Sequence, residues 1–169
     1  MYFSGFCFEG EEILFTDFSH KSIYDISGFS YGAQKATEEV FNRLKKNQRV
    51  QKLILYSPAF FEDKNEAYKR LQILSFKKNR QAYIQNFLDK AGADQECNKY
   101  FKEGILEELE ALLSYKWCKD KLEYIIKKGV SIEVYLGGND RIIDANTTKD
   151  FFASLAVVCF MKGFNHCLK

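Results

Sequence analysis

The chain is poor in several features that would assign it to a particular class of protein. Its 169 residues contain only two histidines, and the five cysteines include no C-x-x-C pair. Structural zinc sites need closely spaced thiol and imidazole ligands, so we expect no metal. No apolar run approaches the ~20 residues that a membrane-spanning helix requires, and we expect no membrane association.

Net charge and targeting signals are also scarce. The formal charge of +2 is too small to indicate nucleic-acid binding and allows at most a local basic patch. Scattered cysteines, odd in number, predict free thiols in a reducing compartment. Functional-looking residues begin at Ser4 and Gly5, which leaves no room for a removable leader. We therefore expect a cytoplasmic protein.

What the chain does contain is typical of one globular domain. Hydrophobic residues make up 46% and aromatic residues 16% of the sequence, enough for a buried core at this length. No internal repeat or low-complexity linker divides residues 1–169. The whole chain is therefore predicted to be a single domain.

Short apolar runs alternate with helical patterns along the chain. Strands are predicted at residues 2–4, 23–26, 50–56, 131–136 and 156–160. Helices are predicted at 33–46 and, with an Asn or Thr cap, at 146–155. Residues 63–128 are expected to be helical throughout and to form an insertion. This alternation favours an α/β fold, with a mostly parallel sheet of about five strands flanked by helices.

The sharpest motif is Gly28-Phe29-Ser30-Tyr31-Gly32, a G-x-S-x-G between a predicted strand and a predicted helix. In that context the serine occupies a tight, strained turn, with its hydroxyl exposed above the sheet. The flanking glycines make room for the turn. The alternative is an ordinary structural turn, and we interpret Ser30 as a nucleophile.

A nucleophilic serine needs a base and an orienting carboxylate. With this motif the chain order is serine, acid, histidine, and only His166 follows Ser30, whereas His20 precedes it in a polar stretch. Asp140 follows the predicted strand at 131–136 and is the expected acid. Asp144 is the alternative, somewhat farther from the strand end.

Two backbone amides are expected to stabilise an oxyanion. The Tyr31 N–H lies at the start of the predicted helix, where the helix dipole favours negative charge. The Phe6 N–H follows Gly5 in the loop after the first predicted strand. An ordinary tight turn is the alternative for that loop. No cofactor is needed for this chemistry.

The order of these motifs resembles the α/β-hydrolase family along most of the chain, in a truncated form. Within it, the chain more closely resembles the short pimelyl-[acyl-carrier-protein] methyl ester esterases of biotin synthesis. The segments that carry it read YDISGFSYGA, IEVYLGGNDRI and FNHCL. At the oxyanion loop, Ser4 stands in place of the family's usual histidine.

The resemblance implies hydrolysis of the methyl ester of a pimelyl chain attached to an acyl carrier protein. Residues 63–128 would form a helical lid, and its basic residues would dock the acidic carrier, namely Lys69, Arg70, Lys77, Lys78 and Arg80. A solvated helix face is the alternative for this run. Acidic residues at 103–110 would repel such a partner. A general carboxylesterase or thioesterase, or a catalytically silent binding protein on the same fold, remain competing interpretations.

Overall fold

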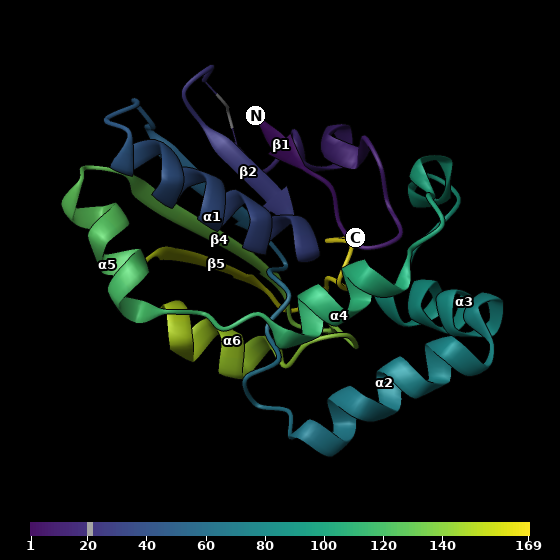
Figure 1. Ribbon diagram of the computed structural model, residues 1–169. Coiled ribbons are helices and arrows are strands. Elements are labelled where there is room, and N and C mark those ends of the chain that lie inside the picture. Colours follow the sequence, from purple (N-terminus) through teal and green to yellow (C-terminus); the bar gives the residue numbers. More distant parts are fainter. Residues whose placement is uncertain (20–21) are drawn as a thin grey trace.

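The computed structural model describes residues 1–19 and 22–169 and contains a five-stranded, wholly parallel sheet (Figure 1). The strands lie in the sheet in their order along the chain: β1 (Tyr2–Phe3), β2 (Ile26–Phe29), β3 (Lys52–Tyr56), β4 (Ser131–Gly137) and β5 (Val157–Met161). Central strands of a parallel sheet are covered on both faces and read as continuous apolar runs. In β3, Leu53, Ile54, Leu55 and Tyr56 are all buried. The predicted parallel sheet is confirmed.

One face of the sheet is covered by regular helices. The helix α1 (Tyr31–Lys45) contacts β1, β2 and β3, and α5 (Lys119–Lys127) packs beside it. The face of α1 that contacts the sheet carries residues at three- and four-residue steps, and they are almost fully buried: Ala33, Ala36, Val40 and Leu44. The helix α6 (Ala145–Phe152) contacts β4 and β5.

Aromatic side chains before β2 cover the opposite face. Gly28 faces α1, since a Cβ there would meet the backbone of Gly32. Side chains alternate along a strand, so Phe29 points to the opposite face. Phe15, in the 3₁₀ turn η1 (Glu11–Phe15), stacks on Tyr56 with ring centroids 4.6 Å apart and lies 5.0 Å from Phe29. Phe18 extends this layer to Tyr135. The short segment between β1 and β2 therefore covers this face in place of a second layer of helices.

The segment between β3 and α5 contains three α-helices, which we call the cap helices: α2 (Glu66–Lys78), α3 (Arg80–Ala91) and α4 (Leu106–Ser114). Figure 1 shows them grouped at one side of the sheet. The expectation of continuous helix over residues 63–128 is wrong. Asn79 ends α2 and caps α3, and Gly92, at φ 72°, ends α3. A 3₁₀ turn, η2 (Cys97–Tyr100), and irregular backbone then lead to α4.

The last residues of the chain return to the cap helices after β5. The Cys167 N–H donates to the Ala91 carbonyl at 3.3 Å, and the Asn165 amide donates to the Gly92 carbonyl at 3.1 Å. Both acceptors lie at the end of α3. The C-terminal loop, which carries His166, is therefore fixed between the sheet and the cap helices.

Candidate active site

Ser30 occupies a strained turn between β2 and α1. Its backbone, at φ 52° and ψ −113°, lies outside the regions that ordinary residues prefer. A Cβ at Gly28 would lie 2.2 Å from the Gly32 carbonyl oxygen, and a Cβ at Gly32 would lie 1.9 Å from the Phe3 carbonyl oxygen. The two glycines of the motif therefore allow strand, turn and helix to approach this closely.

The side chains of Ser30, His166 and Asp140 form one hydrogen-bonded chain. Nε2 of His166 lies 2.9 Å from the Ser30 Oγ, and its Nδ1 lies 2.6 Å from Oδ2 of Asp140. A carboxylate beside Nδ1 favours the proton on that nitrogen, which leaves Nε2 as an acceptor for the serine hydroxyl. The three residues predicted from the motif and from the chain order are therefore adjacent in space.

The hydroxyl is not exposed, contrary to the expectation from the turn. Ser30 is only 3% exposed, and the side chains of His166 and Asp140 are fully buried. The ring of Phe29 packs 5.2 Å from the imidazole. The turn does lift Ser30 above the sheet, but side chains of the cap helices cover it.

The loop after β4 holds Asp140 in place. Its Oδ1 accepts hydrogen bonds from the N–H groups of Ile142 and Ile143 at 2.7 and 3.0 Å, which leaves Oδ2 for the imidazole. A Cβ at Gly137 would lie 2.2 Å from the Asn165 carbonyl oxygen. The strand end and the histidine loop therefore touch directly at this glycine.

Asp144, the alternative acid, has a different role. Its side chain accepts a hydrogen bond from the Thr147 N–H at 2.9 Å and caps α6. That bonding lowers the pKa of the Asp144 carboxyl below its usual value. The expected Asn or Thr cap is therefore replaced by Asp144. The alternative base, His20, lies outside the described residues.

The two expected oxyanion donors lie in the loop after β1 and at the start of α1. Phe6 is buried, whereas Tyr31 is partly exposed. Within the part of the chain that the structure describes, neither backbone N–H donates to a protein acceptor. Both amides therefore retain their hydrogen-bonding capacity.

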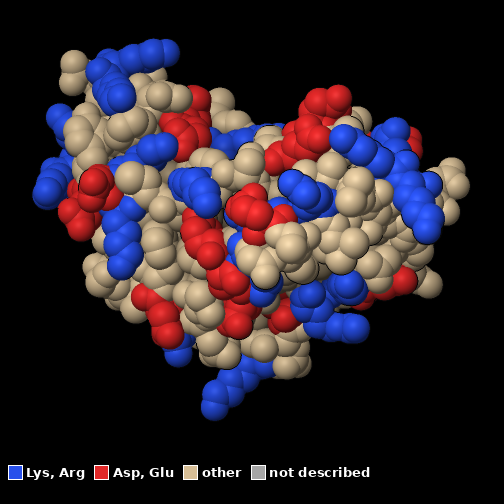
Figure 2. Space-filling model, turned by 60° about the horizontal axis from the view of Figure 1, so that its bottom comes forward, with Lys and Arg blue, Asp and Glu red and all other residues tan. Residues whose placement is uncertain are grey.

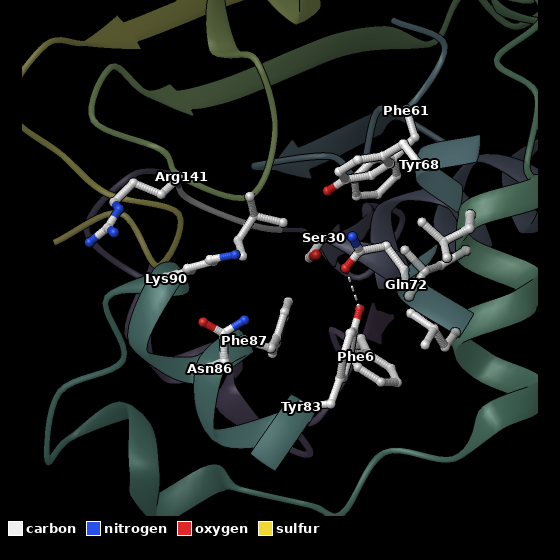
Figure 3. A pocket seen from close by; sticks show the side chains of 14 residues that line it. Phe6, Ser30, Phe61, Tyr68, Gln72, Tyr83, Asn86, Phe87, Lys90 and Arg141 are labelled. Carbon is white, nitrogen blue, oxygen red and sulfur yellow. Dashed lines mark hydrogen bonds between the residues drawn. The ribbon is translucent and has the colours of Figure 1, made fainter. Parts of the chain in front are cut away.

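A narrow cavity of about 60 Å³ opens onto Ser30 (Figure 3). Much of its wall is apolar, formed by Phe6, Phe61, Phe87, Leu109, Leu112, Leu113 and Ile142. Tyr83 and Phe87 line it from α3. These apolar residues form one part of the wall, and polar side chains form the rest.

The polar part of the wall was missed by sequence reasoning. In Figure 3, Tyr68, Gln72, Asn86 and Lys90 project from the cap helices around the cavity. The Tyr83 hydroxyl donates to the Gln72 side-chain oxygen at 3.1 Å, and burial raises the pKa of Tyr83 well above its usual value. Because these residues occupy ordinary helical positions without a motif, only their helical spacing could have grouped them.

The basic run on α2 and α3 is not a uniform positive face. Lys69 is only 7% exposed, close to Glu66, and does not fit the docking role expected for it. Lys77 pairs with Glu110 at 3.5 Å, and Arg80 pairs with Glu103 at 3.1 Å.

The acidic residues at 103–110 thus neutralise part of the basic run, where repulsion of a partner was expected. Figure 2 shows acidic and basic side chains interspersed on this face. Arg70 and Lys78 are exposed.

The cysteines do not belong to the serine site. All five are free thiols, and burial raises the pKa of Cys7 to about 12, so it is not a nucleophile at neutral pH. Among residues 1–19 and 22–169, no cluster of three or more His, Cys, Asp or Glu side chains could hold a metal ion. No helix within the same residues is long and apolar enough to cross a bilayer.

Comparisons with known proteins give structural likeness without close sequence relatives. No protein-family model and no curated protein matches the chain. BioG from Haemophilus influenzae is similar in structure, with a TM-score of 0.60 and 13% identity over 98% of this chain and 87% of its own. An esterase from Exiguobacterium antarcticum reaches a TM-score of 0.65 at 16% identity.

The chain is shorter than most of these structures. It covers 59% of the Exiguobacterium esterase and 60% of a bromoperoxidase from Bacillus anthracis, which has a TM-score of 0.62 and 16% identity. Identities this low establish the fold alone. Together with the parallel sheet and the strand–Ser30–helix turn, they show that the chain has a truncated α/β-hydrolase fold.

Proposed function

We propose that the chain is a serine ester hydrolase that uses Ser30, His166 and Asp140. The observation that carries this proposal is the continuous hydrogen-bonded chain from the Ser30 hydroxyl to the Asp140 carboxylate. Burial of all three groups supports it, because electrostatic interactions are stronger where water is excluded than in bulk water. The cavity that reaches Ser30 gives a substrate access to the hydroxyl.

In the proposed reaction, the Ser30 Oγ attacks the ester carbonyl while Nε2 of His166 takes its proton. Asp140 holds the imidazole in the required tautomer. The Phe6 and Tyr31 amides donate hydrogen bonds to the oxyanion. His166 then protonates the departing alcohol, and water attacks the acyl-enzyme by the same route to release a carboxylate and free Ser30.

As substrate we propose the methyl ester of a pimelyl group on an acyl carrier protein, with methanol as the first product. The three segments that resemble the short pimelyl esterases support this choice. The BioG likeness, which extends over nearly all of both chains, supports a hydrolase fold of this compact size. The apolar residues of the cavity wall suit an acyl chain.

Two further parts of the proposal concern location and docking. The free thiols support a cytoplasmic location. Contact with an acidic carrier is supported by two exposed cations on α2, Arg70 and Lys78. Lys77 and Arg80 lie beside them in exposed ion pairs. The cap helices would then form a lid between the carrier and Ser30.

The proposed substrate tests the reaction directly, because it contains both a methyl ester and a thioester. Mass spectrometry of the products should show loss of the methyl group with the acyl chain still on the carrier. Release of the carrier instead would indicate a thioesterase. No turnover of this substrate or of small aryl esters would favour a binding protein.

The Ser30→Ala variant should lower kcat/KM by about 10⁴-fold or more, because the nucleophile is removed. Its free energy of unfolding should change by only about 1 kcal/mol, the scale of the one hydrogen bond that is lost. Ser75→Ala, at an exposed position on α2, is the matched control and should retain activity. Normal turnover by Ser30→Ala would overturn the assignment.

A further inference from the structure

A second buried carboxylate, Glu11, lies close to the proposed site but outside the hydrogen-bonded chain. It begins the η1 turn and is 0% exposed. Within the described residues it forms no ion pair, and its Oε2 is buried without a hydrogen-bond partner. Burial of a carboxylate without a cation costs several kcal/mol. We therefore expect Glu11 to have a specific role in the structure or at the site.

The other oxygen of Glu11 contacts the backbone of the expected oxyanion loop. Its Oε1 accepts hydrogen bonds from the Gly5 N–H and from the Tyr2 hydroxyl, both at 2.8 Å. Burial, followed by the charge of Glu11, raises the pKa of Tyr2 far above its ordinary value, so Tyr2 stays a proton donor. Glu11 thus fixes the peptide unit that precedes Gly5.

The next peptide unit carries the Phe6 N–H and is fixed from its other side. Its carbonyl oxygen, on Gly5, accepts a hydrogen bond from the Phe8 N–H at 3.2 Å. In a trans peptide the N–H points opposite to the carbonyl, so this bond also sets the direction of the Phe6 N–H. Further along the loop, the Cys7 carbonyl accepts a hydrogen bond from the Lys102 N–H at 3.0 Å.

We infer that Glu11 is a positioning residue that holds the oxyanion loop, so that the Phe6 N–H is directed at the reacting carbonyl before substrate binds. This inference rests on the proposed function and adds a residue to it. Glu11 acts through the Gly5 N–H, without contact to the substrate. Preorganised donors of this kind contribute about 10²–10³-fold each to kcat.

The test compares Glu11→Met, Glu11→Gln and Tyr2→Phe on a small aryl ester and on a fluorophosphonate that labels active serines. Glu11→Met removes the acceptor at similar volume and should lower kcat by about 10–100-fold, with KM within about twofold. The rate of fluorophosphonate labelling should fall in parallel. Glu11→Gln retains a carbonyl acceptor for Gly5 and should restore most of kcat.

Tyr2→Phe is the matched control, because it removes the other hydrogen bond to the same Glu11 oxygen. It should lower the melting temperature but leave kcat within about twofold. Equal loss of kcat in Tyr2→Phe and Glu11→Met, or unchanged kcat in Glu11→Met, would show that Glu11 has only a structural role.

If Glu11→Met does not fold, Glu11→Asp replaces it, because the shorter side chain withdraws the carboxylate from Gly5. An unchanged kcat in Glu11→Asp would overturn the inference. An inactive wild-type chain would instead refute the proposed function, and this inference with it.

Discussion

At the scale of single residues, the site depends on positions where a side chain is absent as much as on those where one is present. Gly28 and Gly32 allow α1 to approach the ends of β1 and β2, and Gly137 allows the histidine loop to touch β4. Ser30 is then held in a backbone conformation that an isolated peptide would rarely adopt. Packing of the surrounding backbone stabilises that conformation.

We therefore expect Gly32→Ala to be severely destabilising. The added Cβ would lie 1.9 Å from the Phe3 carbonyl oxygen, so β1 or α1 must move, and the free energy of unfolding should fall by more than about 3 kcal/mol. Gly163→Ala is the matched control, because no atom lies within 4 Å of its added Cβ. It should change stability by about 0.5 kcal/mol or less. Urea unfolding measures both, and equal stability of the two variants would contradict the packing at this turn.

At this scale the sequence was informative where residue type and spacing are dictated by chemistry. The pattern around Ser30, the only downstream histidine and the aspartate after a strand were enough to predict which side chains meet. Glu11 could not be found in this way. A carboxylate that accepts hydrogen bonds from a backbone N–H and a tyrosine has no fixed sequence neighbours.

At the scale of elements, α1 and the strands other than β2 were predicted because their apolar patterns are local. The strand expected at 23–26 is wrong in position, since β2 spans Ile26–Phe29 and Ile23 is exposed. The cap helices were predicted less well. Their breaks at Asn79 and Gly92 are marked by residues that cap or end helices. The pairing of α2 with α4, through Lys77 and Glu110, depends on tertiary contacts that no local pattern encodes.

The exposed cations of α2 lead to a prediction at this scale. Reversing charge in Arg70→Glu/Lys78→Glu should raise KM for the carrier-bound substrate about tenfold, because attraction to an acidic partner becomes repulsion. KM for a small aryl ester should change by less than about twofold. The control pair Lys127→Glu/Lys128→Glu changes exposed lysines at the end of α5 and should affect neither. An equal effect on both substrates would exclude α2 as the docking face.

At the scale of the whole molecule, five parallel strands and one helical layer are sufficient to bring distant segments together. Ser30, Asp140 and His166 all follow carboxyl ends of parallel strands, where sites of α/β proteins form. The strand order 1-2-3-4-5 places the strands before Ser30 and Asp140 on either side of β3. Chain order and sheet order therefore coincide, which made the architecture predictable from the alternation of elements. The cavity was not predictable, because its wall combines the Ser30 turn, the loops after β1, β3 and β4, and the cap helices.

Fluorophosphonate labelling followed by peptide mass spectrometry shows whether the buried hydroxyl of Ser30 is a nucleophile. We predict one adduct per chain, on Ser30, and no adduct in Ser30→Ala. An unlabelled wild-type chain, or an adduct that persists in Ser30→Ala, would contradict it.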